Sequence, residues 1–211
     1  MNKLEIRNIT LSDGQTNDCF FIDGIPLHDH LTKPFSKHGL GRADDLAIAW
    51  KAAYDNDGDA RFMRFLMEKD KLNLPILLCP EDLDFTCTVI VADTEKSDSS
   101  VMWKRIGMFD HSCESRTEEK LHGIAYVEAY SDEDWDKYND PELYDVDSSK
   151  WKSWISANWS EELFRRRVNY TYPLYQDEKN INWLYECDLC FDRAEYDKLI
   201  ASCRPVFAGT L

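Results

Sequence analysis

Short apolar runs bounded by turn residues predict a hairpin at the start of the chain. Residues Lys3–Ile9 alternate between apolar and polar side chains, and the apolar run Cys19–Ile22 follows. Asp23-Gly24 comes next, and Asp-Gly between two apolar runs is typical of a two-residue hairpin turn. Pro26 has no backbone N–H to donate, so we expect the return strand to be short or to lie at a sheet edge.

Later alternating or continuous apolar runs predict further strands. The segment Thr86–Asp93, rich in β-branched residues, carries the strongest strand signal, and Val101–Met108 is its expected hairpin partner. The other predicted strands are Pro75–Cys79, Gly123–Tyr130 and Ile181–Phe191.

Apolar residues at intervals of three and four predict helices between these strands. The predicted helical segments are Asp44–Tyr54, Ala60–Lys71, Ser149–Tyr170 in two pieces, and a last helix after Asp192. Ser160 is expected to cap the second piece, and Asp192 with Glu195 matches a capping box. Pro34–Gly41, with its two glycines, is predicted to be a loop.

The whole pattern favours one folded domain. The chain has 211 residues, of which 43% are apolar and 13% aromatic, enough to bury a sizeable core. It shows no internal repeat, low-complexity linker or clear boundary. We therefore predict a single α+β domain over residues 1–211, with a mostly antiparallel sheet and flanking helices.

The compartment expected for this chain is the cytoplasm. The N-terminus lacks the apolar core of a signal peptide, and no run approaches the roughly 20 apolar residues that span a bilayer. The seven cysteines are scattered and odd in number, which is typical of reduced thiols rather than of a disulfide framework.

Charge is concentrated in one segment, Glu128–Asp147. It holds nine acidic residues and one base, a local net charge of −8 within a total of −15, and it interleaves them with Tyr130, Trp135, Tyr138 and Tyr144. Carboxylates beside Tyr and Trp are the composition of a hot spot for a basic protein. The predicted partner-binding residues are Asp132, Glu133, Asp134, Trp135, Asp136, Tyr138, Asp140, Glu142, Tyr144, Asp145 and Asp147.

The same acidity argues against other classes of partner. A pI near 4.7 disfavours binding to the phosphate backbone of nucleic acids or to anionic membrane surfaces. The one dense basic cluster, Arg165–Arg167, follows Glu161 and Glu162 at helical spacing. Ion pairs four residues apart therefore account for two of its three arginines, and a phosphate site is the less favoured interpretation.

The sequence contains only weak motifs for metal binding or catalysis. Leu27–His30 contains two histidines and Asp29, and on an extended segment His28 and His30 share a face suited to a metal ion or a general base. Histidines beside a turn are the simpler interpretation. Cys187 and Cys190 have zinc-ligand spacing, but three residues apart on a strand they point to opposite faces. We expect no cofactor, no metal and no enzyme activity, since nucleophile and phosphate-loop motifs are absent.

Three stretches carry a resemblance to a known family: CPEDLDFTCTVIVADTEKSDSSVMWKRIG (79–107), NWSEELFRRRVNYTYP (158–173) and NINWLYECDLCFDRAEYDKL (180–199). They resemble bacterial immunity proteins of contact-dependent growth inhibition and other polymorphic toxin systems. The resemblance implies a protein that binds and neutralises a cognate toxin domain, commonly a nuclease, and it assigns no residue roles. Two alternatives stay open: an enzyme or metal-binding protein using Leu27–His30, and an acidic regulatory or scaffold protein.

Overall fold

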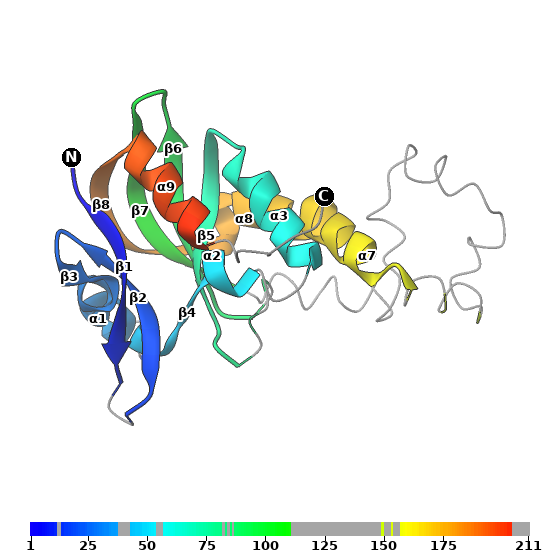
Figure 1. Cartoon of the computed structure of the whole chain (residues 1–211), viewed down its shortest axis with the longest axis horizontal. Helices are drawn as coiled ribbons and strands as arrows, with labels where there is room; N and C mark the ends of the chain where they lie inside the picture. The colour runs from blue at the N-terminus through cyan, green and yellow to red at the C-terminus, as the bar shows by residue number, and fades with distance from the viewer. Residues whose placement is uncertain are drawn as a thin grey trace.

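A computed structural model gives the structure of residues 1–11, 14–37, 43–53, 57–81, 83, 85, 87–110, 149, 153 and 157–203 (Figure 1). Within these residues the strands form two antiparallel sheets. The first has the order β1 (Leu4–Thr10), β2 (Thr16–Ile22), β3 (Ile25–Pro26). The second has the order β4 (Ala47–Ile48), β5 (Lys71–Leu78), β6 (Val89–Lys96), β7 (Ser100–Phe109), β8 (Ile181–Asp192).

Helices flank these sheets, so the protein belongs to the predicted α+β class. They are α1 (Leu27–Lys37), α2 (Ala49–Ala52), α3 (Asp57–Met67), α7 (Trp159–Arg166), α8 (Tyr172–Gln176) and α9 (Arg193–Cys203). The π-helical turn η6 (Arg167–Thr171) joins α7 to α8, and the 3-10 turns η1 (Ala43–Asp45) and η7 (Glu178–Asn180) complete the set. None of the helices in these described ranges has the length and apolar character needed to cross a membrane.

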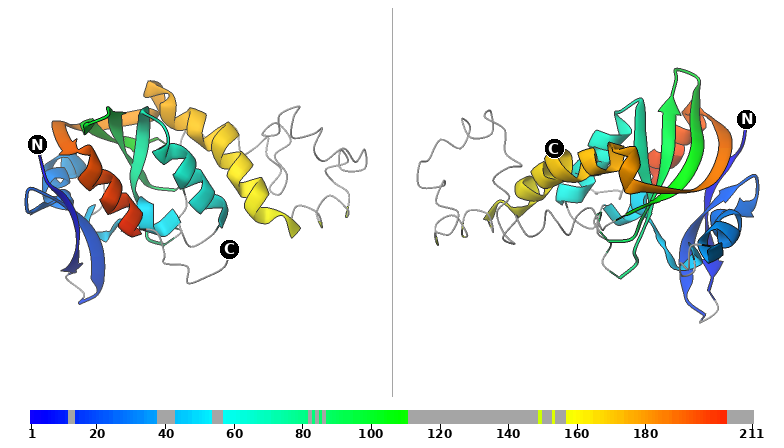
Figure 2. Two further views of the ribbon diagram at one scale, coloured as in Figure 1. Left: turned by 45° about the horizontal axis from the view of Figure 1, so that its top comes forward. Right: turned by 180° about the vertical axis from the view of Figure 1, so that it is seen from behind.

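The helices pack on the sheets through their apolar faces. Helices α2 and α9 lie over one face of the five-stranded sheet, α3 continues this layer past β5, and α7 runs alongside α3 away from the sheet (Figure 2). Helix α1 packs between β2 and β8. Fully buried aromatic residues join both sheets to α2 and α9, with the rings of Phe20, Trp50, Trp103 and Tyr196 in edge-to-face contact.

The predicted N-terminal hairpin is confirmed. Asp23 and Gly24 have φ values of 51° and 84°, as a type I′ turn requires, and Ile22 pairs with Ile25 across it. The strands β7 and β8 are confirmed as well. The strand predicted at Thr86–Asp93 is shifted toward the C-terminus, because pairing with β5 and β7 runs from Val89 to Lys96.

The helix predicted at Ala60–Lys71 ends at Met67, and Lys71 begins β5 instead. Three other local predictions are wrong. Pro34 lies inside α1 rather than in a loop, because Leu27, Leu31 and Phe35 form a buried stripe at intervals of four that stabilises the helix through it. The helix predicted from Asp44 is reduced to the four residues of α2, because Ala47 and Ile48 instead pair with the edge of β5.

The third concerns the start of α7. Its N-cap position is Asn158 and Ser160 lies inside the helix, so Ser160 does not cap it. The predicted strand Gly123–Tyr130 lies outside the described residues.

Candidate functional site

The acidic segment Glu128–Asp147 lies outside the residues that the structure describes. All the predicted partner-binding residues, from Asp132 to Asp147, belong to this segment, and positions 111–131 and 148 on either side of them are outside the described residues as well. The described residues include a cluster of basic side chains whose charge is opposite to that of the acidic segment.

The arginine cluster of α7 and η6 is held by carboxylates. Arg165 donates to Glu161 over 2.7 Å and Arg166 to Glu162 over 2.8 Å, which confirms the two predicted pairs four residues apart. Arg61 of α3 also donates to Glu161, over 2.6 Å. These contacts tie α7 to α3, so the cluster is engaged within the fold and is not a free phosphate site.

The same pairing extends over the described structure. Arginines from both sheets and from four helical segments each have a carboxylate within ion-pair distance in the chain: Arg7, Arg61, Arg105, Arg165, Arg166, Arg167 and Arg193. Neutralised guanidinium groups cannot attract a polyanion strongly. The excess carboxylates of the chain therefore set the sign of its long-range field.

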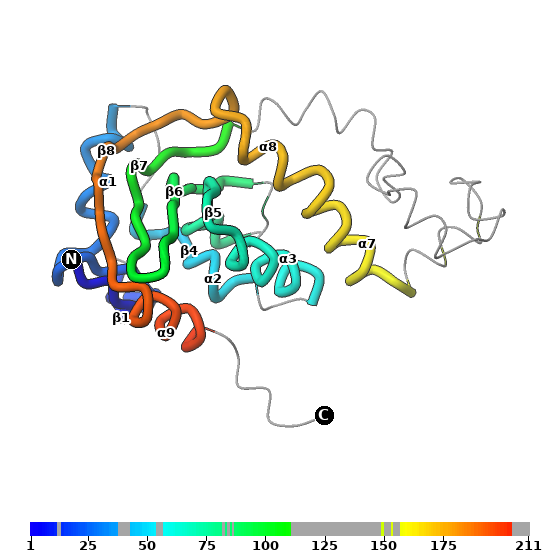
Figure 3. The backbone as a smooth tube through the Cα atoms, turned by 90° about the horizontal axis from the view of Figure 1, so that it is seen from above, coloured from blue at the N-terminus to red at the C-terminus, as the bar shows by residue number. Residues whose placement is uncertain are grey.

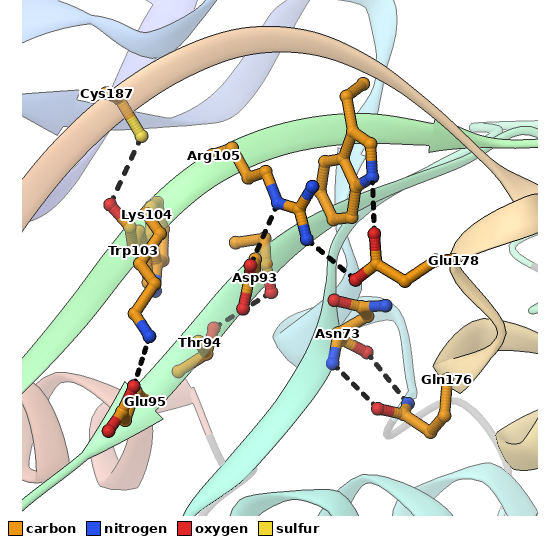
Figure 4. A network of polar contacts seen from close by, with 12 residues as sticks. Asn73, Asp93, Thr94, Glu95, Trp103, Lys104, Arg105, Gln176, Glu178 and Cys187 are labelled. Atoms are coloured by element: carbon orange, nitrogen blue, oxygen red, sulfur yellow. Dashed lines mark hydrogen bonds and ion pairs between the residues drawn. The ribbon is translucent and has the colours of Figure 1, made fainter.

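A polar network on the five-stranded sheet centres on Arg105 (Figure 4). Its guanidinium donates to Asp93 over 2.9 Å and to Glu178 over 2.7 Å, and it lies 3.8 Å from the ring centroid of Trp183. Trp183 Nε1 in turn donates to Glu178 over 3.0 Å. A hollow of about 180 Å³ adjoins this network.

The amide groups beside Arg105 complete the network. The backbone N–H of Asn73 donates to Gln176 Oε1 over 2.9 Å, and the Asn73 side chain donates to the carbonyl of Tyr175 over 2.7 Å. These bonds fix the end of α8 against β5. Because each charge faces an opposite one and each amide has a partner, the arrangement stabilises this corner and presents no free nucleophile or base.

The two histidines of Leu27–His30 diverge. They lie in the first turn of α1, where residues two apart point in different directions, so the predicted shared face is wrong. His28 Nδ1 lies 3.5 Å from Cys19 Sγ and its Nε2 lies 3.4 Å from Asp29 Oδ1, whereas the His30 ring lies 6.0 Å from that of Tyr185. The described residues contain no group of three or more His, Cys, Asp or Glu side chains arranged to hold a metal ion.

Cys19 beside His28 is a juxtaposition that sequence reasoning missed. The β2–β3 hairpin brings the thiol to the imidazole, and no local pattern signals it. Burial raises the pKa of the Cys19 thiol. Hydrogen bonds with the backbone of His28 and Leu27 lower this pKa, but by less. A thiol held in its protonated form is a poor nucleophile, so the pair does not form an activated cysteine.

The other cysteines behave as core or strand residues. Cys187 Sγ donates to the carbonyl of Trp103 over 3.3 Å, and burial raises its pKa to about 11. Asp188, with φ of 45°, interrupts the regular strand between Cys187 and Cys190. The six cysteines in the described ranges are free thiols, as predicted, and Cys113 lies outside those ranges.

A groove of about 430 Å³ lies between β1 and α9. Leu4, Ile6, Phe191 and Leu199 line it together with charged residues at its margins. Sequence reasoning missed this groove, because it is formed by elements from the two ends of the chain.

Comparison of the chain with protein-family models, with curated proteins and with solved structures finds no match. Its function is therefore argued from its own residues.

Proposed function

We propose that this protein binds a basic protein domain and inhibits it, as the immunity protein of a toxin system does. The observation that carries the proposal is the segment Glu128–Asp147, in which four aromatic residues are interspersed among nine carboxylates. A nuclease toxin must attract a polyanion, so its active site is basic. An acidic surface bearing aromatic anchors is complementary to such a site.

The pairing of arginines within the fold supports this proposal. Since the guanidinium groups named above are engaged by carboxylates of the same chain, they do not offset the charge of the acidic segment at a distance. Unbalanced carboxylates increase the rate of encounter with a basic partner, and this increase weakens as salt screens the charges. We place the inhibitor in the cytoplasm, where free thiols such as those of the six described cysteines persist.

Charge reversal within the segment tests the proposal. The variant carries Asp132→Lys, Glu133→Lys, Asp134→Lys and Asp136→Lys, and it is assayed by surface plasmon resonance against the toxin domain encoded next to its gene. Association should slow at least about tenfold at low salt, and most of the salt dependence should disappear.

The matched control reverses four carboxylates of the described surface: Glu68→Lys, Glu81→Lys, Asp98→Lys and Glu186→Lys. All four residues are exposed, and the control has the same net charge as the test variant. It should keep most of the wild-type association rate. Equal rates for the two variants would show that only total charge matters and would refute a binding face centred on Asp132–Asp147.

The aromatic residues should act on dissociation instead. Trp135→Ala should speed dissociation by an amount equivalent to roughly 2 kcal/mol or more, as is typical of a hot-spot tryptophan. Circular dichroism of the free variant separates this effect from a loss of folding. An unchanged dissociation rate in a folded variant contradicts the role of Trp135 as an anchor.

A further inference from the structure

Strand β1 has one edge that is paired and one that is open. The N–H of Asp23 donates to the carbonyl of Lys3 over 2.9 Å, and the N–H of Lys3 donates to the Asp23 carboxylate over 2.7 Å. The backbone of Lys3 therefore faces β2. Because successive residues of a strand direct their backbone groups to alternate edges, Leu4, Ile6 and Asn8 direct theirs away from β2.

The N-terminal end of that second edge confirms the alternation. Asn2 directs its N–H to the carbonyl of Cys190 over 2.6 Å and forms an isolated parallel bridge with Phe191. The pairing stops there because β8 ends at Asp192 and the chain turns into α9, which lies beside β1 (Figure 3). In the described structure no strand pairs with β1 beyond Asn2 on this edge.

An open edge next to a hollow is a template for another strand. The groove of about 430 Å³ between β1 and α9 adjoins the backbone of Leu4 and Ile6, whose side chains are half-buried in the core. Leu4 and Ile6 share one face of the strand. Lys3, Glu5 and Arg7 share the opposite face, where Glu5 forms ion pairs with both bases.

The charges on that face are self-complementary in the antiparallel register centred on Ile6. A register centred on Leu4 would pair Lys3 with Glu5, but it needs the edge of Asn2, which is already bonded to Cys190. The backbone groups of Leu4, Ile6 and Asn8 point to the open edge. Two copies can therefore pair through this edge only where these residues lie opposite one another. With Ile6 opposite Ile6 of a second copy, Leu4 meets Asn8, and Glu5 meets Arg7 twice. Shifting the register by two residues in either direction places Glu5 opposite Glu5 or Arg7 opposite Arg7, which is unfavourable.

We propose that β1 is the interface of a symmetric homodimer, in which residues 4–8 of two copies pair antiparallel about a two-fold axis at Ile6. The sheet β1-β2-β3 then continues into its counterpart, and the groove beside α9 receives the second copy's strand. Because Glu5 of each copy lies opposite Arg7 of the other in this register, the charges favour a second copy as the occupant rather than an unrelated peptide. Glu5 and Arg7 form non-hydrogen-bonded pairs, in which side chains approach most closely.

Two single charge reversals and their mixture test this interface. In Glu5→Arg each arginine at position 5 faces Arg7 of the other copy, and in Arg7→Glu each glutamate at position 7 faces Glu5. Replacing two attractive pairs by two repulsive ones should raise the dimer dissociation constant roughly tenfold or more, measured by analytical ultracentrifugation. Glu68→Arg, an exposed change in the turn that follows α3, is the matched control and should leave the dimer unchanged.

The mixture separates contact between copies from contact within a copy. When the Glu5→Arg and Arg7→Glu proteins are combined, both pairs become oppositely charged again, so a heterodimer should form with close to wild-type affinity. The Glu5–Arg7 pair within each chain stays broken in the mixture, so a role confined to one chain predicts no recovery. Circular dichroism checks that both variants fold.

The proposal is overturned if the wild-type chain sediments as a monomer at about 100 μM, where even a weak dimer forms. It is also overturned if the single reversals remain dimeric or if their mixture does not associate. The charge-reversed variant of the acidic segment should dimerise like wild type. Loss of partner binding in that variant with an intact dimer therefore tests the proposed function separately.

Discussion

A buried ion pair between α3 and the π-helical turn η6 gives the sharpest prediction about stability. Arg167 Nε donates to Asp59 Oδ1 over 2.7 Å, and the exposed fractions of the two side chains are 5% and 4%. The guanidinium also lies 5.5 Å from the ring centroid of Phe85. With so little water nearby, the carboxylate of Asp59 compensates the buried charge of Arg167.

We expect Asp59→Asn to lower the free energy of unfolding by about 3 kcal/mol or more. The substitution keeps the size and polarity of the side chain but leaves a buried guanidinium opposite a neutral amide, and removing one partner of a buried pair costs about 3–5 kcal/mol. This is a large share of the roughly 5–15 kcal/mol that stabilises a typical domain. The loss also removes a carboxylate from the first turn of α3, where it stabilises the helix dipole.

The assay is urea denaturation followed by tryptophan fluorescence and circular dichroism. Asp197→Asn is the control, because the Arg193–Asp197 pair has the same 2.7 Å separation but side chains that are 28% and 51% exposed. It should cost less than about 1 kcal/mol. The double variant Asp59→Asn/Arg167→Met should recover part of the loss. A cost for Asp59→Asn as small as that for Asp197→Asn refutes the reasoning that burial makes the difference.

Three further predictions concern the core and the pH dependence. Burial lowers the pKa of Lys96 from 10.5 to about 8, so its charge destabilises the fold below pH 8 and this penalty is relieved between pH 8 and 10.5. Wild type should thus gain stability relative to Lys96→Met as the pH rises from 8 to about 10, and a constant difference in urea titrations contradicts this. Gly107→Ala should lower the free energy of unfolding by about 1–3 kcal/mol, because the added Cβ would lie 2.5 Å from Ile181 Cγ2. An unchanged melting temperature in thermal unfolding refutes that overlap. Trp103 Nε1 donates to the buried hydroxyl of Tyr196 over 3.1 Å. Trp103→Phe and Tyr196→Phe should therefore each lower the free energy of unfolding by about 1–3 kcal/mol, and the double variant should lower it by less than the sum. Strict additivity in denaturant titrations contradicts that coupling.

Local chemistry accounts for the parts of the fold that the sequence predicted well. The Asp23-Gly24 turn forms because only residues that tolerate positive φ fit it. The backbone N–H of Glu195 donates to Asp192 Oδ1 over 3.0 Å, the bond by which Asp192 caps α9. Each of these features depends on residues within four positions of one another, so the sequence alone contains the required information.

Competition between local signals and pairing explains the errors. Ala47 and Ile48 have helical neighbours, but pairing with Leu78 and Leu77 draws them into β4. Pro34 disfavours a helix, but the buried stripe of α1 outweighs it. Propensity is weak beside burial, so the element that buries more apolar surface prevails.

By itself the sequence determined the α+β class, the N-terminal hairpin, the hairpin β6-β7, the strand β8 and the clustering of acidic residues in Glu128–Asp147. Only the tertiary structure decided which distant residues meet. It brought Arg167 to Asp59 across 108 positions, Cys19 to His28, and β1 to α9. Such contacts are set by how whole elements pack around one core, and that packing depends on all apolar faces at once rather than on any local pattern.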